Sequence, residues 1–526
     1  MLLDLPAPCN LAAHFLDRPA AEHPGRVAIL GEPAVLRYAE LAQLANRAGN
    51  ALRSLGSAPG DPVLIVLPDS AEFVAAFFAA AKIGSVAVPV NSMTRTADYA
   101  YYLADSGARV AIVHSAALAE FLPAAEIAPL EHLVVVGAPP GAALAAKVRG
   151  KLHRWSTCVD AASAELPPHP TSAGDPAFLL YTSGSGGQPK AAIHQHKDML
   201  VTSRSFAHGV LDLRADDRTF SVSKLFFAYG LGNGMYFPFS VGAATLLNPE
   251  RPRADKILEM VARHRPTVFF AVPTFYAALL READRGARAD FSSVRLAVSA
   301  GEALPAEIFG QFRKRFGLEI LDGIGSTEML HMFISCRPGQ ARPGTCGLEV
   351  PDYEARILDD AGQPVSTGEI GNLWIKGQSA FAGYWNQPEL TARTRQGDWV
   401  ATGDKFYRDA DGYHHYCGRT DDMMKVAGMW VSPGEVENVL LGHPLVAEAA
   451  VVGASDALGL LHPVAYVVLR AGASAGAALA EVIREFVRAR LPSYKCPQQV
   501  HFLAELPKTA TGKTQRFRLR GLAAGQ

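Results

Sequence analysis

The sequence has few cysteines, no surplus of either charge and no long hydrophobic run. Its six cysteines are scattered without a C-x-x-C pair, which argues against a disulfide framework or a zinc site and favours reduced thiols. The 50 basic and 51 acidic residues nearly cancel, which argues against a general binder of nucleic acid or membrane surfaces. The apolar stretch after Pro62 is interrupted by Asp69, Glu72 and Lys82, so we expect no membrane span. Because the amino terminus shows no basic start and no cleavage signal, we expect a cytosolic protein.

What is present indicates a globular protein built from strands and helices. A chain of 526 residues is too long for one ordinary core, so two or more domains are expected. Short apolar runs alternate with segments of helical spacing, which predicts an α/β layer structure with a mostly parallel sheet. The predicted strands are 63–67, 85–90, 110–113, 132–136, 176–180, 267–271 and 296–299, and the predicted helices include 38–52 and 71–83. Residues 137–175, rich in Ala, Gly and Pro, are predicted to form a surface excursion.

The stretch 181–190, Y-T-S-G-S-G-G-Q-P-K, follows one of these strands and has the composition of a phosphate-binding loop. Its six small residues from Thr182 to Gly187 expose backbone N–H groups and hydroxyls without bulk. Lys190 adds a compact, mobile cation at the far end. The pattern is not a Walker A loop, because G-x-x-x-x-G-K-[ST] cannot be aligned with it. A triphosphate cradle is one interpretation, and a flexible surface turn is the other.

A second polar stretch, 322–328 with the sequence D-G-I-G-S-T-E, suits a phosphate together with Mg²⁺. Its hydroxyls and its carboxylate are oxygen ligands, which Mg²⁺ prefers. The same residues are also compatible with a capped helix start, in which Ser326 or Thr327 is the N-cap. On that helix His331 would lie one turn beyond Glu328, either lining a pocket or playing a structural role.

Two further stretches carry weaker signals. The aromatic residues Phe226, Phe227 and Tyr229 could wall a flat apolar pocket or belong to the plain core. The strand 296–299 ends in A-G-E, and small residues at a strand end let a ligand approach the backbone.

The segment 194–197 is predicted to start a helix, on which His194 and His196 would point in different directions. We therefore expect ordinary polar roles for these two histidines and no metal site.

Taken together, these stretches resemble the motifs of the adenylate-forming enzymes: acyl- and aryl-CoA synthetases, peptide-synthetase adenylation domains and luciferases. The resemblance covers about residues 30–520, with five motifs in the family's order, among them T-G-D at 402–404, G-R-T-D-D at 418–422 and P-K-T-A-T-G-K at 507–513. The phosphate loop departs from the family form at Gly186, where Thr is usual, and at Ala191, where Gly is usual. The stretch F-F-A-Y-G-L-G-N at 226–233 is similar to the version found in benzoate–CoA ligases.

The resemblance implies roles for individual residues. Lys190, Thr327, Glu328 and Lys513 would be catalytic, and Glu328 would hold Mg²⁺. Asp322 and Gly323 would flank adenine, Asp404 would bind the ribose hydroxyls, Arg419 would contact ribose and phosphate, and Gly428 would border the tunnel for the pantetheine arm of CoA. The nucleotide- and CoA-binding set as a whole is Thr182, Ser183, Gly184, Ser185, Gly187, Gly301, Glu302, Asp322, Gly323, Ser326, Asp404, Arg419 and Gly428. The acid pocket would consist of Phe227, Ala228, Tyr229, Gly230, Ala300, Ile324, Gly325 and His331.

The implied architecture is a large amino-terminal region of layered α/β subdomains, residues 1–420, and a small mobile α+β domain, residues 421–526, with the hinge at Asp421. The implied activity is that of an ATP-dependent aryl-CoA ligase, which converts benzoate or a hydroxy- or aminobenzoate to its CoA thioester. The cofactors would be ATP, Mg²⁺ and CoA, the intermediate an acyl-AMP, and the other products AMP and pyrophosphate.

Several alternatives remain open from the sequence. The same residues would serve an enzyme that loads an aryl acid onto a carrier protein, or a ligase for other small carboxylic acids. The glycine at position 186 prompts the further alternative of a non-catalytic descendant. The sequence predicts no nucleic-acid or membrane partner, is compatible with a homodimer, and does not decide which ring substituents fit.

Overall fold

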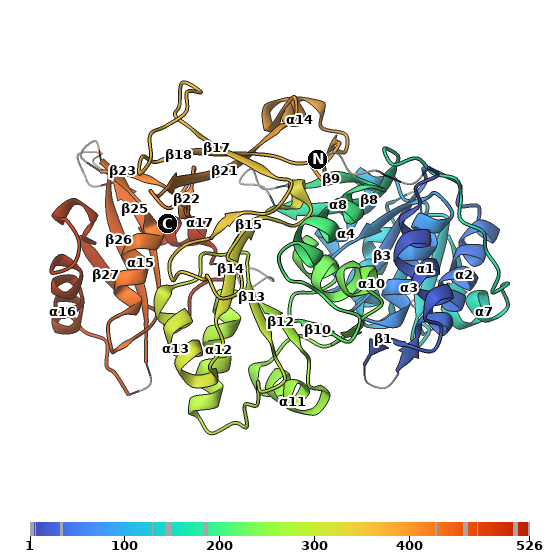
Figure 1. The fold of residues 1–526 in the computed structure, drawn as a ribbon, viewed down its shortest axis with the longest axis horizontal. Coiled ribbons are helices and arrows are strands. Elements are labelled where there is room, and N and C mark those ends of the chain that lie inside the picture. Colours follow the sequence, from blue (N-terminus) through green and yellow to red (C-terminus); the bar gives the residue numbers. More distant parts are fainter. Residues whose placement is uncertain are drawn as a thin grey trace.

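The computed structural model describes residues 5, 7–31, 35–128, 130–141, 150–183, 188–426, 429–455, 461–470, 472–508 and 514–523. Within them the chain forms two large, mostly parallel sheets, a smaller antiparallel sheet and a separate carboxyl-terminal layer. Figure 1 shows the carboxyl-terminal elements at the left and the first strands and helices at the right. The predicted α/β class, with a large amino-terminal and a small carboxyl-terminal part, is confirmed.

The central strands of the first sheet are buried on both faces, whereas its edge strand β7 is mostly exposed. In spatial order its described strands are β19 (Gly383–Tyr384), β9 (Pro189–Gln195), β8 (Pro176–Ser183), β4 (Val86–Pro89), β3 (Pro62–Val66), β5 (Val110–His114), β6 (His132–Val136) and β7 (Lys151–Arg154). Val63 and Ile65 of β3 pack on the side of helices α2 (Tyr38–Ser54) and α3 (Ala71–Lys82). Their neighbours Leu64 and Val66 pack against α4 (Thr96–Ser106) and α5 (Leu118–Ala125). This double burial explains the continuous apolar runs, which are typical of parallel strands.

The second sheet faces the first across the largest core. Its described strands, in spatial order, are β16 (Leu348–Glu349), β15 (Met332–Ser335), β14 (Ile320–Gly325), β13 (Leu296–Ser299), β12 (Val268–Ala271), β10 (Arg218–Ser221), β11 (Ala244–Leu246), β1 (Val27–Leu30) and β2 (Leu36–Arg37). Phe270 and Val298 point into the core shared with the first sheet. Phe269 and Ala297 belong to a second cluster, which packs under α11 (Ala254–His264), α12 (Pro273–Asp284) and α13 (Ala306–Phe316).

Short elements connect these layers. The helical ones are η1 (Ala13–Asp17), α1 (Arg18–Glu22), η2 (Ser115–Ala117), α7 (Trp155–Asp160), α8 (Asp198–Thr202), η3 (Ser203–His208), α9 (Ala228–Leu231), η4 (Gly232–Tyr236), α10 (Phe237–Ser240), η5 (Thr327–Met329) and α14 (Pro388–Thr394). The third sheet contains β17 (Glu354–Leu358), β18 (Gly371–Lys376), β21 (Trp399–Arg408), β20 (Arg395–Gln396) and β22 (His414–Arg419). It joins the two large sheets to the carboxyl-terminal part of the chain.

The carboxyl-terminal part has its own core. It contains β23 (Met424–Val426), β24 (Met429–Val431), α15 (Pro433–Leu441), β25 (Val446–Ser455), β26 (Leu461–Leu469), α16 (Ala477–Arg488), η6 (Ser493–Lys495), β27 (Gln499–Phe502) and α17 (Arg516–Ala523). Val451 and Ala465 of the three-stranded sheet pack against Val436 and Ile483 of α15 and α16. These contacts form a hydrophobic cluster separate from those of the amino-terminal sheets, as expected for a domain.

Two local predictions are wrong. Residues 194 and 195 do not start a helix: they end strand β9, and helix α8 begins at Asp198. Residues 137–175 are not only a surface excursion, because they contain β7, at the edge of the first sheet, and α7. Trp155 and Val159 of α7 are buried against the core. In both places strand pairing, with β8 at residues 194–195 and with β6 along β7, outweighed the local composition, which had favoured helix and loop.

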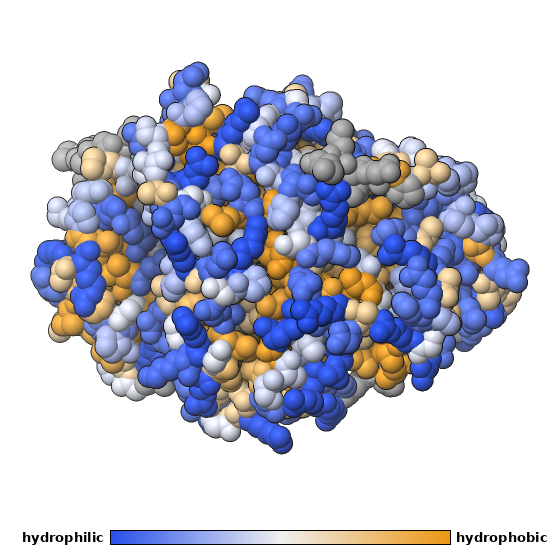
Figure 2. Space-filling view, in the orientation of Figure 1, coloured by the Kyte–Doolittle hydropathy of each residue, from blue (hydrophilic) through white to orange (hydrophobic). Residues whose placement is uncertain are grey.

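No described helix is long and apolar enough to cross a membrane. On the face drawn in Figure 2, polar residues prevail, with hydrophobic ones interspersed among them. The six cysteines are all free, and Cys158 is the one that is not fully buried.

Candidate active site

Lys190, Glu328 and Tyr384 form a compact polar cluster between the two large sheets. Lys190 lies in β9, Glu328 in the single turn η5 after β14, and Tyr384 in β19. Lys190 Nζ lies 3.2 Å from Glu328 Oε1 and 4.2 Å from the centroid of the Tyr384 ring. The Tyr384 hydroxyl accepts a hydrogen bond from Lys190 and donates one to Glu328 Oε1 at 2.5 Å. Segments far apart in the sequence thus bring a cation, an anion and a phenol together.

The electrostatics of this cluster keep Glu328 ionised. Burial by itself would raise the pKa of Glu328, but the Lys190 ammonium and the Tyr384 hydroxyl outweigh burial and hold this pKa below its ordinary value. Burial and the neighbouring Glu328 carboxylate raise the pKa of Tyr384, so the phenol keeps its proton and acts as a donor. The sequence analysis missed Tyr384, because an isolated Gly-Tyr pair carries no chemical signature.

The turn that carries Glu328 is shorter than predicted. Ser326 is its N-cap, since the Ser326 hydroxyl oxygen accepts a hydrogen bond from Met329 N at 3.3 Å, which confirms one of the two predicted caps. The turn ends after Met329, because Leu330 adopts φ 67° and ψ −38°. His331 therefore does not follow Glu328 by one turn of a continuing helix, and it instead leads into β15.

The carboxyl end of β13 lies beside the middle of β14 at this site. Asp322 of β14 pairs in register with Ser299 of β13, and its carboxylate accepts a hydrogen bond from Leu304 N at 3.3 Å. Burial raises the pKa of Asp322 to about 7. Gly301 follows β13 with φ 96°, a conformation that favours glycine, and Glu302 beside it is half-buried. The carboxyl ends of parallel strands are where α/β sheets bind ligands.

Aromatic rings surround His331. Its ring stacks on Tyr229, with centroids 5.5 Å apart and an interplanar angle of 27°. Phe206 and Phe237 lie at centroid distances of 5.0 Å and 4.6 Å, and neither was named by the sequence analysis. Burial lowers the pKa of His331 to about 3, so its imidazole is neutral. Neither ring nitrogen reaches a hydrogen-bond partner among the described residues.

The other predicted acid-pocket residues lie in the same region. The partly buried ones, packed against the largest core, are Phe227, Ala228, Tyr229 and Ile324. Ala300 is buried, and Gly325 is half-buried at the end of β14. A Cβ atom on Gly230 would lie 2.0 Å from the Lys224 carbonyl oxygen, so only glycine fits there. The walls are apolar and aromatic, which suits a flat, uncharged ring.

Asp404 and Arg419 face each other on neighbouring strands β21 and β22. Arg419 Nη1 lies 3.0 Å from Asp404 Oδ1 and also donates to the Thr402 carbonyl oxygen at 2.9 Å. The Asp404 side chain is buried, whereas that of Arg419 is half-exposed. An acceptor-only carboxylate beside a guanidinium can bind a diol and a phosphate together.

Part of the predicted site lies outside the described residues. Gly184, Ser185, Gly186, Gly187, Gly428 and Lys513 belong to this group. Thr182 and Ser183 end β8, where Thr182 pairs in register with Lys190 of β9. Strands β8 and β9 therefore bring both ends of the predicted phosphate loop beside Glu328.

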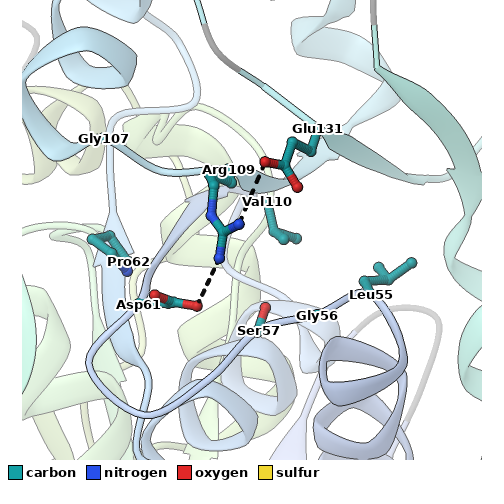
Figure 3. A pocket seen from close by; sticks show the side chains of 9 residues that line it. All are labelled: Leu55, Gly56, Ser57, Asp61, Pro62, Gly107, Arg109, Val110 and Glu131. Atoms are coloured by element: carbon teal, nitrogen blue, oxygen red, sulfur yellow. Dashed lines mark hydrogen bonds and ion pairs between the residues drawn. The ribbon is translucent and has the colours of Figure 1, made fainter.

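Two hollows lie away from the polar cluster. A cavity of about 30 Å³ sits at the amino ends of β3 and β5, where Arg109 bridges Asp61 at 3.2 Å and Glu131 at 3.4 Å (Figure 3). Because it lies at the wrong end of the strands for a ligand site, we assign it a structural role. A groove of about 550 Å³ runs along the third sheet and reaches Gly403, next to Asp404.

The described residues contain no group of three or more His, Cys, Asp or Glu side chains that could hold a metal ion. Glu328 is thus a single ionised carboxylate, placed next to hydroxyl-bearing residues. Such a donor set does not form a protein cage for a metal. It does fit Mg²⁺ carried by a nucleotide, because Mg²⁺ is commonly held by one or two carboxylates plus substrate phosphates.

Two family models match the sequence. The model described as "AMP-binding enzyme" matches residues 16–385, and the one described as "AMP-binding enzyme C-terminal domain" matches residues 435–513. Among curated proteins, benzoate–CoA ligase of Thauera aromatica is 43% identical over 499 residues, which cover 94% of this chain and 92% of that protein. The 4-hydroxybenzoate–CoA/benzoate–CoA ligase of Rhodopseudomonas palustris is 39% identical over 523 residues, which cover 98% and 94%.

A solved structure resembles the whole chain. The crystal structure of an anthranilate CoA ligase in complex with anthranoyl-AMP superposes with a TM-score of 0.93 at 40% sequence identity. The superposition covers 99% of this chain and 98% of that one. The similarity therefore extends over both the amino-terminal sheets and the carboxyl-terminal part.

Proposed function

The chain belongs to the AMP-binding enzyme family, and from that premise we propose that it is an ATP-dependent aryl-CoA ligase. It is an AMP-forming acid–thiol ligase whose cofactors are ATP, Mg²⁺ and CoA. The proposed acid is benzoate or a hydroxy- or aminobenzoate. Its carboxylate attacks the α-phosphate of ATP, which gives an acyl-AMP and releases pyrophosphate. The CoA thiol then attacks the acyl carbon, forming the thioester and releasing AMP.

One observation carries this proposal: the polar cluster of Lys190, Glu328 and Tyr384 and the aromatic pocket meet at a single short segment. Glu328, in contact with Lys190 and Tyr384, and His331, in contact with Tyr229, are separated by two residues. A ring acid in that pocket would hold its carboxylate beside the groups that bind MgATP. Holding the two reactants together supplies much of the rate of such a transfer, since little acid–base chemistry is required.

The residues present can hold the nucleotide. Glu328 would ligate Mg²⁺, which neutralises phosphate charge when bound. Lys190 and the loop from Thr182 to Gly187 would contact the phosphates, with Thr327 and Ser326 at the next turn. Asp322 and Gly323, with Gly301 and Glu302 at the end of β13, would border the adenine. Asp404 and Arg419 would bind the ribose, and their 3.0 Å ion pair supports this pairing of roles.

Two assigned residues outside the described part complete the proposal. Lys513 would enter the site for adenylation, where its ammonium neutralises charge between the carboxylate and the α-phosphate. Gly428 would border the pantetheine tunnel during thioester formation. Both require residues 421–526 to rotate about Asp421 between the half-reactions. Asp421 is exposed between β22 and β23, and the separate carboxyl-terminal core supports rotation as a unit.

The test is pyrophosphate release with MgATP and a panel of acids, each with and without CoA. The panel holds benzoate, hydroxybenzoates, aminobenzoates, cinnamate, acetate and octanoate. We expect multiple turnovers with a benzoate-type acid only when CoA is present. Turnover confined to alkyl acids would contradict the aryl pocket. If no acid of the panel supports turnover, the proposed activity is contradicted.

Besides the residue roles, the domain boundary and the hinge, four further predictions from the sequence stay predictions. They concern a carrier protein as acyl acceptor, a homodimer, the cytosolic location and the ring substituents. The panel separates the first, because a carrier-protein enzyme would release pyrophosphate once per site and would not form a CoA thioester. One extra ring substituent typically changes the free energy of binding by about 1–3 kcal/mol, so the panel also ranks the substituents.

A further inference from the structure

The turn that carries Glu328 is tethered by its own backbone. The carbonyl oxygens of residues 327, 328 and 329 each accept a hydrogen bond from a distant segment. The donors are His194 Nε2 at 2.7 Å, Phe381 N at 2.8 Å and Ser379 Oγ at 2.8 Å. Strand β9 and the segment before β19 therefore hold the turn along its whole length.

Leu330 shows why such tethers are needed. It is buried and adopts φ 67° with ψ −38°, outside the regions that branched residues ordinarily occupy. A backbone of this kind persists only where the surroundings hold it. Without the tethers the turn could relax, and the Glu328 carboxylate would move with it.

His194 is placed to hold the first of these carbonyls. It lies four residues after Lys190 on β9, so both side chains project from the same face of the strand. Lys190 contacts the Glu328 carboxylate, and His194 contacts the Thr327 carbonyl one residue earlier. Strand β9 thus contacts the turn twice, once at the Glu328 side chain and once at the Thr327 main-chain carbonyl.

Asp198 fixes the orientation of that imidazole. A carbonyl oxygen only accepts, so His194 Nε2 must carry a proton. His194 Nδ1 lies 2.9 Å from Asp198 Oδ2, which also accepts a hydrogen bond from Gln195 N at 2.9 Å. Both side chains of the pair are fully buried, and the His194 ring stacks on Phe178 at 5.1 Å. The ring can neither turn nor exchange its partner for water.

We propose that His194, oriented by Asp198, is a positioning residue for Glu328 and thereby for the Mg²⁺ of bound MgATP. The inference rests on the proposed function, because it requires Glu328 to hold that ion. His194 reaches neither substrate nor metal: it acts through the Thr327 carbonyl. Residues that orient a metal ligand in this way typically change metal affinity by about 10–100-fold when they are replaced.

The test uses two substitutions that mimic different nitrogens of the ring. In His194→Asn the amide stands near Nδ1, so the contact with Asp198 is kept and the donor to Thr327 is lost. In His194→Gln the amide reaches the position of Nε2, so that donor is restored. His196→Asn is the matched control, because His196 is equally buried but accepts its hydrogen bond from Leu11 N, remote from the turn.

The readout is ATP binding by titration calorimetry with Mg²⁺ and with EDTA, alongside thermal unfolding of each variant. His194→Asn should weaken binding of MgATP by about ten-fold or more and leave binding of metal-free ATP unchanged. His194→Gln should recover most of that loss, and His196→Asn should keep the wild-type ratio of the two affinities. An unchanged ratio of the two affinities in His194→Asn would overturn the proposal. If both affinities fall by the same factor, His194 has a structural role only.

Asp198→Asn provides the second variant in case His194→Asn does not fold. The amide oxygen would replace Oδ2 as the acceptor for Gln195 N and His194 Nδ1. A neutral imidazole would then carry its proton on Nδ1 and face the Thr327 carbonyl with a lone pair. We expect a similar loss of the Mg²⁺-dependent part of the affinity, and its retention would overturn the proposal. If the wild-type protein binds no MgATP and releases no pyrophosphate, the proposed function fails instead.

Discussion

Asp322 places a carboxyl group where water does not reach. It is 5% exposed in the middle of β14, and burial raises its pKa from 3.8 to about 7. Between these two values the folded protein holds a proton that the unfolded chain has released. The folded state therefore binds more protons, and the free energy of unfolding falls as the pH rises through this window. Above about pH 7 the loss is complete.

Asp322→Asn should remove this pH dependence, because the amide keeps the shape of the side chain and does not ionise. We expect the variant to gain stability over the wild type at both pH values, and to gain about 2 kcal/mol more at pH 8.5 than at pH 5.5. Urea unfolding of the ligand-free protein at the two pH values measures the difference. Asp398→Asn, at an exposed position, serves as the control, and an equal gain at both pH values would contradict the assignment.

The β14–turn–β15 hairpin depends on close approach of its two strands. Gly323 pairs in register with Ser335, and a Cβ atom on Gly323 would lie 2.2 Å from Met332 Cε and 2.5 Å from the Ile334 carbonyl oxygen. The methionine side chain could move aside, but the carbonyl belongs to the paired strand. The hairpin that positions Glu328 therefore requires glycine at 323 for space, independently of any contact with a nucleotide.

Gly323→Ala should destabilise the protein by about 1–3 kcal/mol, because the added methyl group forces the two strands apart. Gly310→Ala is the matched control: Gly310 lies inside α13 with no neighbouring atom within 4 Å of the added Cβ. At this position alanine should raise the free energy of unfolding by about 0.5–1 kcal/mol through its helix propensity. Denaturant unfolding measures both changes, and a Gly323→Ala protein as stable as the wild type would show that the strands separate freely.

At the scale of the whole molecule, an ion pair joins the two parts of the chain. Arg281 Nη1 of α12 lies 3.2 Å from Glu448 Oε1 of β25, whose Oε2 lies 2.7 Å from Lys508 Nζ. Arg281 and Glu448 are partly exposed, so the contact is worth only about 0.2–1 kcal/mol. Even that small amount can shift a balance between two domain orientations by up to about five-fold.

Arg281→Gln should therefore shift the two half-reactions in opposite directions, each by about two- to five-fold, if the carboxyl-terminal domain rotates as proposed. Single-turnover formation of acyl-AMP, and transfer of pre-formed acyl-AMP to CoA, measure them separately. Arg285→Gln, at the C-cap of the same helix, is the control, because Arg285 pairs with Glu282 of α12 and not with the carboxyl-terminal part. A parallel change in both steps would argue against an effect on domain orientation.

The sequence alone determined the features that neighbouring residues encode. The apolar run 63–67 predicts a strand, which the structure shows as the buried β3, and the apolar run 296–299 predicts β13 with small residues after its end. Capping acts over three residues, so the sequence narrows the N-cap to Ser326 or Thr327, and the structure decides for Ser326. The family motifs supplied Lys190, Glu328, Asp404 and Arg419 in the same way, as short runs readable without the fold. All of these signals are local.

Only the tertiary structure decided how distant segments meet. Tyr384 contacts Lys190 across 194 positions, and His194 contacts Thr327 across 133, so no local pattern could have named either pair. The wrong predictions at 194–197 and 137–175 have a related cause, because pairing with the preceding strands β8 and β6 outweighed local preference. Phe206 and Phe237 around His331 look like ordinary core residues in sequence. The physical cause is that side-chain contacts depend on packing, which the chain specifies only as a whole.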